Sequence, residues 1–212
     1  MILATLLAAC LQSNNLPLRE FNVKQPQGTV AIFLTGDGGW RRIDEQIKRR
    51  LNEKNVPVVG FLTPNYFSKR KTQEESSCAL EQVIRDTNSD RVILIGFSRG
   101  ADVLPFMISG LSSDVRSKIR VVALLGLEPS IDFHYHPSWI PFFHWHEQQF
   151  PVLPETEKLR DLRVLCVYGE REKDSLCPAI AAWATEVRMK GGHHFAGNYS
   201  AVADAILGAA HP

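Results

Sequence analysis

The residues most able to do chemistry in this sequence form one short segment, Gly96-Phe97-Ser98-Arg99-Gly100. An apolar run at 92–95 precedes the segment, and a helix-like stretch that begins at Ala101 follows it. A serine between a strand and a helix, with glycines two positions away on each side, is typical of a nucleophile elbow. There a strained turn exposes the hydroxyl beside the first amides of the helix, which can stabilise an oxyanion. We therefore predict that Ser98 is a catalytic nucleophile.

A serine nucleophile needs a base, and the base needs an acid that orients it. In chains with this elbow the order is serine, then aspartate or glutamate, then histidine. The acid is expected in the loop after the next-to-last strand. We prefer Asp174 there, because it lies late in the loop and just before a predicted helix, and we keep Glu170 and Glu172 as alternatives.

The histidine is expected after the last strand, where the sequence reads Gly191-Gly192-His193-His194-Phe195. The two glycines allow a tight turn that would bring an imidazole to the elbow. We prefer His194 as the base because it lies nearer the start of the last helix, and His193 is the alternative.

The second half of an oxyanion hole is expected in the loop after the first central strand. That loop reads Thr35-Gly36-Asp37-Gly38-Gly39-Trp40, and its glycines allow the backbone to approach a ligand closely. We predict that the amide of Asp37 or of Gly38 acts together with the amide of Arg99. The loop lacks the Gly-Lys-Ser/Thr and Gly-x-Gly-x-x-Gly patterns of phosphate-binding loops.

Continuous apolar runs alternate with helix-like segments along the whole chain. The runs at 30–35, 56–62, 91–95, 119–125, 162–168 and 186–189 are predicted strands. The segments at 42–54, 72–87, 101–111, 178–185 and 199–207 are predicted helices. Continuous runs indicate strands that are buried on both faces. We therefore predict an α/β fold of the α/β-hydrolase type, with a mostly parallel central sheet and helices on both faces.

The chain of 212 residues suits one domain, which we place at 16–212. A net charge of +1 gives no indication of a nucleic-acid partner. Residues 1–15 resemble the end of an export signal, and Leu7-Ala8-Ala9-Cys10 resembles a lipoprotein processing site. We expect a periplasmic protein in which Cys10 is the candidate for lipidation.

Two cysteines indicate the same compartment. Cys166 ends a predicted strand and Cys177 follows the next short polar loop, so a disulfide between them is feasible. Two buried thiols in a reducing cell are the alternative. We predict the Cys166–Cys177 disulfide, which would hold the loop of the acid in place.

An insert at about 130–158 interrupts the alternation and is rich in histidine, proline and aromatic residues. Loops of this length in compact domains are usually functional. Histidines 134, 136, 144 and 146 raise the question of a metal, but acidic partners are sparse and aromatic residues dominate. We favour a substrate lid or a lipid-facing surface, and we expect neither a metal nor a cofactor.

Several motifs in order resemble the AcvB/VirJ family of bacterial virulence-associated proteins. The resemblance runs from about Leu16 to the C-terminus. The motifs are the loop at 35–40, the elbow continued as Gly100-Ala101-Asp102-Val103-Leu104-Pro105-Phe106, Ala123-Leu124-Leu125-Gly126-Leu127, Asp174-Ser175-Leu176-Cys177-Pro178, and the histidine segment at 191–195. The resemblance implies an α/β-hydrolase fold, export to the periplasm, and hydrolysis of aminoacylated phosphatidylglycerol, notably the lysyl form. It also implies a link to virulence and type IV secretion components.

These implications lead to a specific functional hypothesis. Ser98 would attack the ester of an aminoacyl phospholipid and form an aminoacyl-enzyme, which water would then hydrolyse. A lysyl headgroup carries ammonium groups, so we expect the substrate site to be lined by Asp37, Asp102, Glu128 and Trp40. A general periplasmic carboxylesterase and a non-catalytic secretion partner on a hydrolase scaffold are the alternatives.

Overall fold

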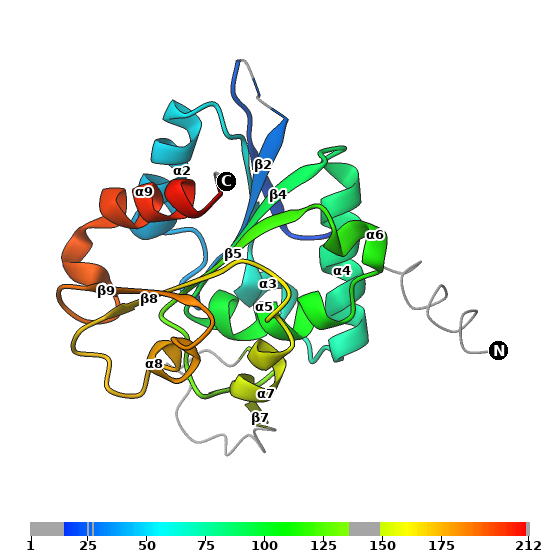
Figure 1. Cartoon of the computed structure of the whole chain (residues 1–212). Coiled ribbons are helices and arrows are strands. Elements are labelled where there is room, and N and C mark those ends of the chain that lie inside the picture. Colours follow the sequence, from blue (N-terminus) through cyan, green and yellow to red (C-terminus); the bar gives the residue numbers. More distant parts are fainter. Residues whose placement is uncertain (1–14, 25, 27, 136–148, 211–212) are drawn as a thin grey trace.

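The computed structural model describes residues 15–24, 26, 28–135 and 149–210 (Figure 1). A seven-stranded sheet with the order β1-β3-β2-β4-β5-β8-β9 forms its centre. Strand β1 pairs antiparallel with β3, and the other neighbours are parallel. The strands are β1 (Leu18–Phe21), β2 (Thr29–Leu34), β3 (Val58–Phe61), β4 (Arg91–Phe97), β5 (Ile119–Leu125), β8 (Val164–Gly169) and β9 (Thr185–Met189).

Helices cover both faces of the sheet (Figure 1). They are α2 (Arg42–Glu53), α3 (Thr63–Tyr66), α4 (Gln73–Asp86), α5 (Arg99–Ser109), α6 (Ser113–Arg116), α7 (Val152–Glu157), α8 (Cys177–Ile180) and α9 (Tyr199–Ala210). A 3₁₀ helix, η1 (Phe195–Gly197), precedes α9, and β6 (Ser130–Ile131) pairs with β7 (Phe150–Pro151) in a small second sheet.

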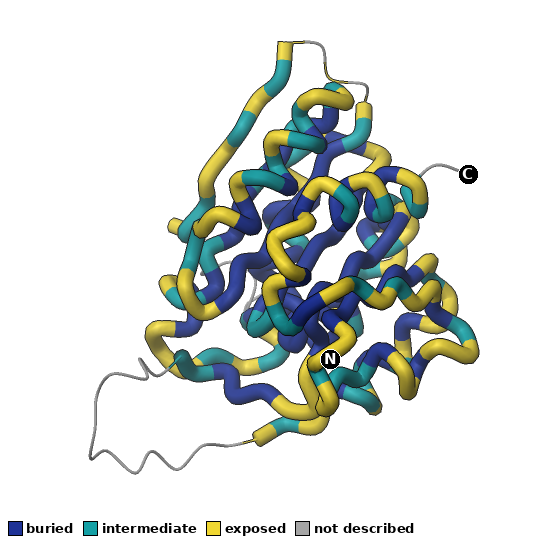
Figure 2. The backbone as a smooth tube through the Cα atoms, turned by 90° about the vertical axis from the view of Figure 1, so that its left-hand side faces the viewer, coloured by how far each residue is buried: buried dark blue, intermediate teal, exposed yellow. Residues whose placement is uncertain are grey.

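Alternate residues of the central strands pack into two separate cores, because successive side chains point to opposite faces of a sheet. Ile32 and Leu94 pack with residues of α4 and α5, whereas Phe33 and Ile93 pack with residues of α2 and α9. The buried strands therefore run between two more exposed layers (Figure 2). This burial on both faces is why the strands read as continuous apolar runs.

Local sequence signals account for the helix starts. Thr72 begins α4 with a capping box, in which its hydroxyl accepts a hydrogen bond from the amide of Glu75 at 3.1 Å. The Glu75 carboxylate in turn accepts one from the amide of Thr72 at 2.8 Å. Helix α2 places Ile43, Ile47 and Leu51 on its buried face, at the four-residue spacing that predicts an amphipathic helix.

The predicted fold class is confirmed by this sheet, and the differences lie at its margins. Strand β1 was not predicted, and it is a short edge strand in which Leu18 and Phe21 are partly buried and the two residues between them are exposed. The helix expected at 178–185 is limited to α8, because the chain turns after Ile180 to enter β9. The ends of the insert form β6, β7 and α7, whereas 136–148 and the export-like residues 1–14 with Cys10 lie outside the described residues.

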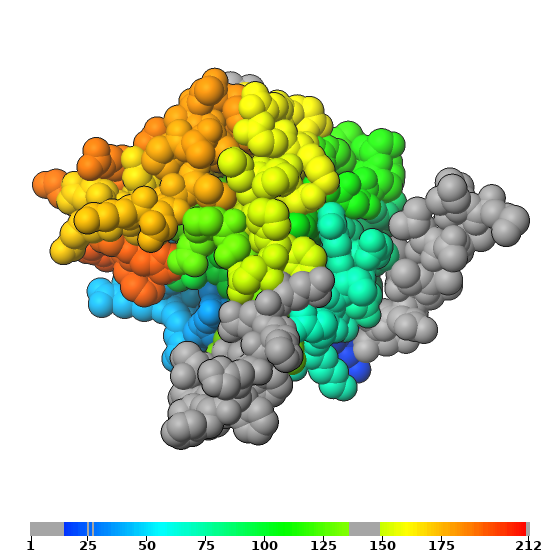
Figure 3. Space-filling model, turned by 90° about the horizontal axis from the view of Figure 1, so that it is seen from below, coloured from blue at the N-terminus to red at the C-terminus, as the bar shows by residue number. Residues whose placement is uncertain are grey.

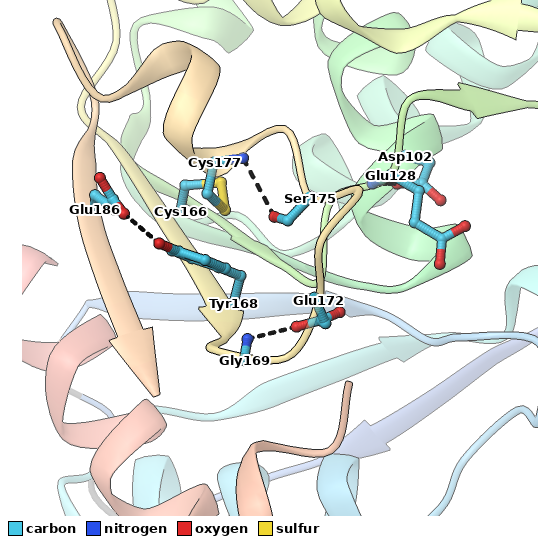
Figure 4. The surroundings of a disulfide bond; sticks show 9 residues. All are labelled: Asp102, Glu128, Cys166, Tyr168, Gly169, Glu172, Ser175, Cys177 and Glu186. Carbon is cyan, nitrogen blue, oxygen red and sulfur yellow. Dashed lines mark hydrogen bonds between the residues drawn. A yellow bond between two sulfur atoms is a disulfide. The ribbon is translucent and has the colours of Figure 1, made fainter. Parts of the chain in front are cut away.

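The predicted disulfide is confirmed: Cys166 in β8 is bonded to Cys177 at the start of α8, with their Cα atoms 5.4 Å apart. Figure 4 shows that the bond closes the loop that leaves β8 at Gly169 and passes Glu172 and Ser175. A disulfide is typical of proteins that fold in an oxidising compartment. No helix in the described ranges is both long and apolar enough to cross a membrane.

Replacing both Cys166 and Cys177 with alanine is expected to lower the free energy of unfolding by about 2–3 kcal/mol, because the closed loop is short. Urea unfolding of the oxidised protein measures this change. The Cys177→Ala single variant is the control, since it breaks the same bond and should account for most of the loss. Equal stability of the oxidised protein and both variants would contradict a stabilising role.

Candidate active site

Ser98 has the backbone conformation of a strained elbow. Its φ of 53° and ψ of −125° lie in a region that non-glycine residues rarely adopt, between the end of β4 and the start of α5. Glycine is required at both flanking positions, because a side chain there would collide with the neighbouring backbone. A Cβ on Gly96 would lie 2.4 Å from the carbonyl oxygen of Gly100, and one on Gly100 would lie 2.2 Å from that of Leu34. The strand, turn and helix predicted from the sequence are thus all present.

The loops that surround Ser98 all leave the carboxyl edge of the parallel sheet. From below, the light-blue start of α2, the lime-green segment after β5 and the red-orange segment after β9 gather on one face (Figure 3). Contacts confirm this proximity. A Cβ on Gly36 would lie 3.2 Å from Cβ of Ser98, and one on Gly126 would lie 2.7 Å from Cε1 of His193. This edge is where open α/β sheets bind their ligands.

A histidine and a carboxylate form a close pair beside the elbow. Nδ1 of His193 lies 2.6 Å from Oε1 of Glu172, and the imidazole packs against the ring of Phe97 with centroids 5.1 Å apart. The other carboxylate oxygen of Glu172 accepts a hydrogen bond from the amide of Gly169 at 2.5 Å (Figure 4). With a 14% exposed side chain, Glu172 is held between the end of β8 and His193.

This pair consists of the alternatives from the sequence rather than the preferred residues. Asp174 and His194 are both exposed, and the structure gives them no mutual contact within the described residues. The reason lies in the turn after β8, where the amide of Glu172 donates to the carbonyl of Gly169 at 2.9 Å. That tight turn directs Glu172, not the later Asp174, toward His193. His194 lies beside the pair, with its ring centroid 5.6 Å from that of Phe97.

Hydrogen bonding to Glu172 raises the pKa of His193 above its ordinary value of 6.5, and this effect exceeds the opposing effect of burial. The nearby carboxylates of Glu128 and Asp37 act in the same direction. A general base must be unprotonated at the nitrogen that accepts the proton. The contact between Nδ1 of His193 and the Glu172 carboxylate is therefore the arrangement of a base that is oriented by an acid.

This raised pKa predicts the pH dependence of catalysis. Activity is expected to fall on the acid side as His193 becomes protonated, with the midpoint of kcat/KM above pH 6.5. Glu172→Gln should move that midpoint to lower pH while it also slows turnover. The measurement is a pH series with a soluble ester. A midpoint that is identical in wild type and Glu172→Gln would show that this pair does not control the reaction.

Gly126 was not identified from the sequence as a site residue. In the structure, the absence of a side chain at Gly126 leaves room for the imidazole of His193. It follows β5 directly and has a φ of +67°, which favours glycine. A Cβ at this position would also lie 2.9 Å from Nδ1 of His193. The available signal was a glycine immediately after a buried strand at the carboxyl edge of the sheet.

The candidate oxyanion loop lies against the elbow in the predicted position. It forms a turn in which the amide of Gly39 donates to the carbonyl of Gly36 at 3.0 Å. Within the described ranges, the backbone amides of Asp37, Gly38 and Arg99 have no hydrogen-bond acceptor in the protein. Backbone amides of this kind, at a loop and at a helix start, are the donors used in oxyanion holes.

A polar cavity of about 170 Å³ opens beside Ser98. It brings together three of the four predicted substrate-binding residues, namely Asp37, Asp102 and Glu128, and adds Asp132. Two of these carboxylates already have partners. Asp37 forms an ion pair with Arg99, and Asp132 forms one with Arg70 at 2.9 Å.

The carboxyl of Asp102 is buried, and its Oδ1 accepts a hydrogen bond from the amide of Glu128 at 2.8 Å. Burial raises the pKa of Asp102 well above its usual range. Asp102 thus staples the loop after β5 to helix α5. By contrast, the side chain of Glu128 is exposed and forms no ion pair with another described residue.

The fourth predicted residue, Trp40, lies elsewhere. Its indole stacks on Phe21 with ring centroids 4.6 Å apart, and it fills the space above Gly60, where a Cβ would lie 2.5 Å from the ring. Its Nε1 donates to Glu45 at 3.1 Å. Trp40 therefore packs β1 and β3 against the start of α2, and it is not among the residues that line the cavity at Ser98.

The metal question concerns the insert. In the described ranges there is no group of three or more histidine, cysteine or acidic residues placed to hold a metal ion. Of the four histidines in the insert, His134 lines the cavity at Ser98, and residues 136, 144 and 146 lie outside the described ranges.

Comparison with solved structures identifies the fold. MenH from S. aureus superposes with a TM-score of 0.64 at 12% identity, over 91% of this chain and 98% of that chain. The thioesterase domain from the curacin biosynthetic pathway gives 0.65 at 15% identity, over 90% and 94%. The monoacylglycerol lipase of Paleococcus ferrophilus gives 0.62 at 13% identity, over 92% and 100%. With the strained serine after β4, this likeness defines an α/β-hydrolase fold.

The family is given by the sequence itself. The model of a family described as "Bacterial virulence protein (VirJ)" matches residues 28–212. The chain therefore belongs to the VirJ family, as the motifs had indicated. No curated protein matches the sequence significantly.

Proposed function

We propose that the protein is a serine ester hydrolase with Ser98 as nucleophile, His193 as general base and Glu172 as the orienting acid. The observation that carries this proposal is the positive φ of Ser98, a strained conformation of the kind that proteins maintain at functional sites. The paired His193 and Glu172 on the neighbouring loops support it. The relatives in fold include a lipase and a thioesterase, which also act on acyl groups.

The reaction then has two halves. His193 accepts the proton of Ser98 as its oxygen attacks the ester carbonyl, and the amides of Arg99 and of Asp37 or Gly38 stabilise the oxyanion. Collapse of this intermediate transfers the proton to the departing alcohol and leaves an acyl-enzyme. Water, deprotonated by His193, attacks the acyl-enzyme and releases the acid together with free Ser98.

We further propose that the substrate is the aminoacyl ester of aminoacylated phosphatidylglycerol, in the lysyl or the alanyl form. Membership of the VirJ family and the acidic lining of the cavity support this choice. The Cys166–Cys177 disulfide supports hydrolysis in the periplasm. We also propose lipid anchoring through Cys10, on the lipoprotein-like motif, and contact with secretion components, which the family resemblance implies.

The direct test combines a probe with a lipid assay. The purified protein should react with a fluorophosphonate probe at Ser98 and release lysine or alanine from the corresponding phosphatidylglycerol ester in mixed micelles. Absence of both reactions would leave a binding protein on a hydrolase scaffold. Equal cleavage of the fatty acyl esters of unmodified phosphatidylglycerol would indicate a general esterase.

Glu128 gives this substrate proposal a specific prediction. Because Asp37, Asp102 and Asp132 already have partners, Glu128 is the carboxylate best placed to receive a substrate ammonium group. Glu128→Gln should reduce turnover of the lysyl lipid roughly three- to tenfold, since an exposed charge pair contributes about 1 kcal/mol. Turnover of the alanyl lipid, which carries one ammonium fewer, should fall less.

The matched control is Glu74→Gln, which removes one exposed carboxylate from the first turn of α4 and leaves the cavity lining unchanged. Both lipids should be cleaved at the wild-type rate by this variant. An equal loss for both lipids in Glu128→Gln would show that Glu128 does not discriminate the lysyl side chain.

A further inference from the structure

The side chain of Arg99 crosses the cavity beside Ser98 and joins two loops. Its Nε contacts Oδ1 of Asp37 on the candidate oxyanion loop, and its Nη1 donates to the carbonyl oxygen of Asp132 at 2.8 Å. The guanidinium also lies over the ring of Tyr135, 5.5 Å from the centroid. Only 13% of the Arg99 side chain is exposed, although arginine side chains usually lie at the surface.

The Arg99 side chain thus forms a bridge between Asp37 and Asp132. The two ends of this bridge differ in how firmly they are held. The carbonyl of Phe133 accepts a hydrogen bond from the amide of Lys71 at 3.0 Å, and the amide of Tyr135 donates to the carbonyl of Phe67 at 2.7 Å. The carboxylate of Asp132 is paired with Arg70. The segment around Asp132 is therefore anchored to the chain between α3 and α4, whereas the Asp37 side chain is 54% exposed.

The charges around the cavity give the bridge a second effect. Asp37, Asp102, Glu128 and Asp132 line the cavity, and Arg99 is the only lysine or arginine in the described part of its lining. An oxyanion that develops on a substrate would be repelled by the carboxylates of Asp37, Glu128 and Asp132. A guanidinium beside Ser98 offsets this repulsion, and its attraction is strengthened by the limited exposure of the site.

We propose that the Arg99 side chain is a positioning residue: it fixes the Asp37 loop so that its amide faces the oxyanion, and it offsets the negative charge at the catalytic centre. The proposal rests on the proposed serine hydrolase function. Arg99 thereby contributes twice, through its backbone amide in the oxyanion hole and through its side chain, which holds the opposite half of that hole.

The pKa of His193 should respond to a change of charge at Arg99 or Asp37. It faces Glu172 from the loop after β8, Glu128 from the segment after β5, Asp37 from the loop after β2 and His194 from its own segment. In Arg99→Met, the uncompensated carboxylate of Asp37 should stabilise the imidazolium, so the acid limb of kcat/KM should move to higher pH. In Asp37→Asn, which removes that carboxylate, the limb should move to lower pH.

The experiment compares Arg99→Met, Arg99→Lys and Asp37→Asn with wild type on a soluble 4-nitrophenyl ester. Arg99→Met should lower kcat about 10- to 100-fold with little change in KM, because a displaced oxyanion donor acts mainly on the transition state. Arg99→Lys should keep the wild-type acid limb, since the charge remains. It should still lose most of the kcat, because a single ammonium cannot hold both Asp37 and Asp132 in the same way.

The control variant is Arg50→Met, which removes an arginine of α2 that pairs with Asp204 at 2.8 Å and neither lines the cavity nor holds Asp37 or Asp132. It should change kcat by less than about threefold. A wild-type kcat in Arg99→Met would overturn the proposal, and so would a loss that is confined to KM, which would instead make Arg99 a substrate contact. Equal losses in Arg99→Met and Arg50→Met, with no shift of the acid limb, would show a merely structural role.

Two measurements do not require turnover. Hydrogen exchange of the Gly39 amide, which donates to the carbonyl of Gly36 in the Asp37 loop, should become faster in Arg99→Met, and an NMR titration should show a higher pKa for His193. If the wild type neither cleaves esters nor reacts with a fluorophosphonate, the proposed hydrolase function fails. Unchanged exchange together with an unchanged His193 titration would refute the role of Arg99 independently of that result.

Discussion

Ser98→Ala is expected to lower ester hydrolysis by about four orders of magnitude or more while the fold is retained. The hydroxyl is the group that forms the acyl-enzyme, and no second nucleophile on the elbow can replace it. Alanine keeps the Cβ and adds no atom, so the packing of Gly96, Gly100 and the neighbouring strands is unchanged. The measurement is release of the alcohol from a soluble ester, together with a circular dichroism spectrum.

Ser130→Ala is the matched control, because Ser130 lines the same cavity but lies on β6 rather than at the elbow. It should retain activity within a few fold of wild type and react normally with a fluorophosphonate. If Ser98→Ala retains full turnover with a native spectrum, Ser98 is not the nucleophile.

His193→Ala should likewise reduce turnover by three to four orders of magnitude, whereas His194→Ala should reduce it less than about fivefold. The difference follows from the pairing, since His193 contacts Glu172 and His194 is exposed beside it. A base that is held by a carboxylate keeps its proton-accepting nitrogen directed toward the serine. The two alanine variants remove the same imidazole from adjacent positions, so each is the control of the other.

Substitution of the acid, Glu172, should also slow turnover, but by a smaller factor than substitution of His193. Glu172→Gln is expected to slow turnover by two to four orders of magnitude, because the amide no longer stabilises the imidazolium. Asp174→Asn, on the same loop, should remain close to wild type. The reverse result, with Asp174→Asn and His194→Ala inactive and the other pair active, would return the roles to the residues preferred from the sequence.

The sequence predicted the elements that position the site because their signals are local. The elbow depends on glycines two residues from Ser98, and the strands before each loop are continuous apolar runs. Parallel strands place their carboxyl ends at one edge, so the loops that meet there follow from the fold class alone. The Cys166–Cys177 bond was predictable for the same reason, since both cysteines flank one short loop.

The pairing within the site was harder to predict because it depends on turns. Whether Glu172 or Asp174 meets the histidine is decided by a tight turn at Gly169, which reverses the chain within three residues. Likewise, Trp40 follows the candidate oxyanion loop, but its ring turns away to fill the space above Gly60. Such directions are set by long-range packing, which a single sequence does not contain.

The assembly of this site has a consequence for how the molecule folds. The nucleophile follows β4, the candidate oxyanion loop follows β2, and the acid and base follow β8 and β9. Each part depends on pairing between strands that are distant in the chain, and such non-local pairing is formed late and slowly. A nascent chain that has completed β4 and α5 holds the serine and the candidate oxyanion loop but neither the acid nor the base. Ester hydrolysis therefore indicates that the sheet is complete. The rate at which activity returns during refolding would measure the rate at which β9 joins the sheet.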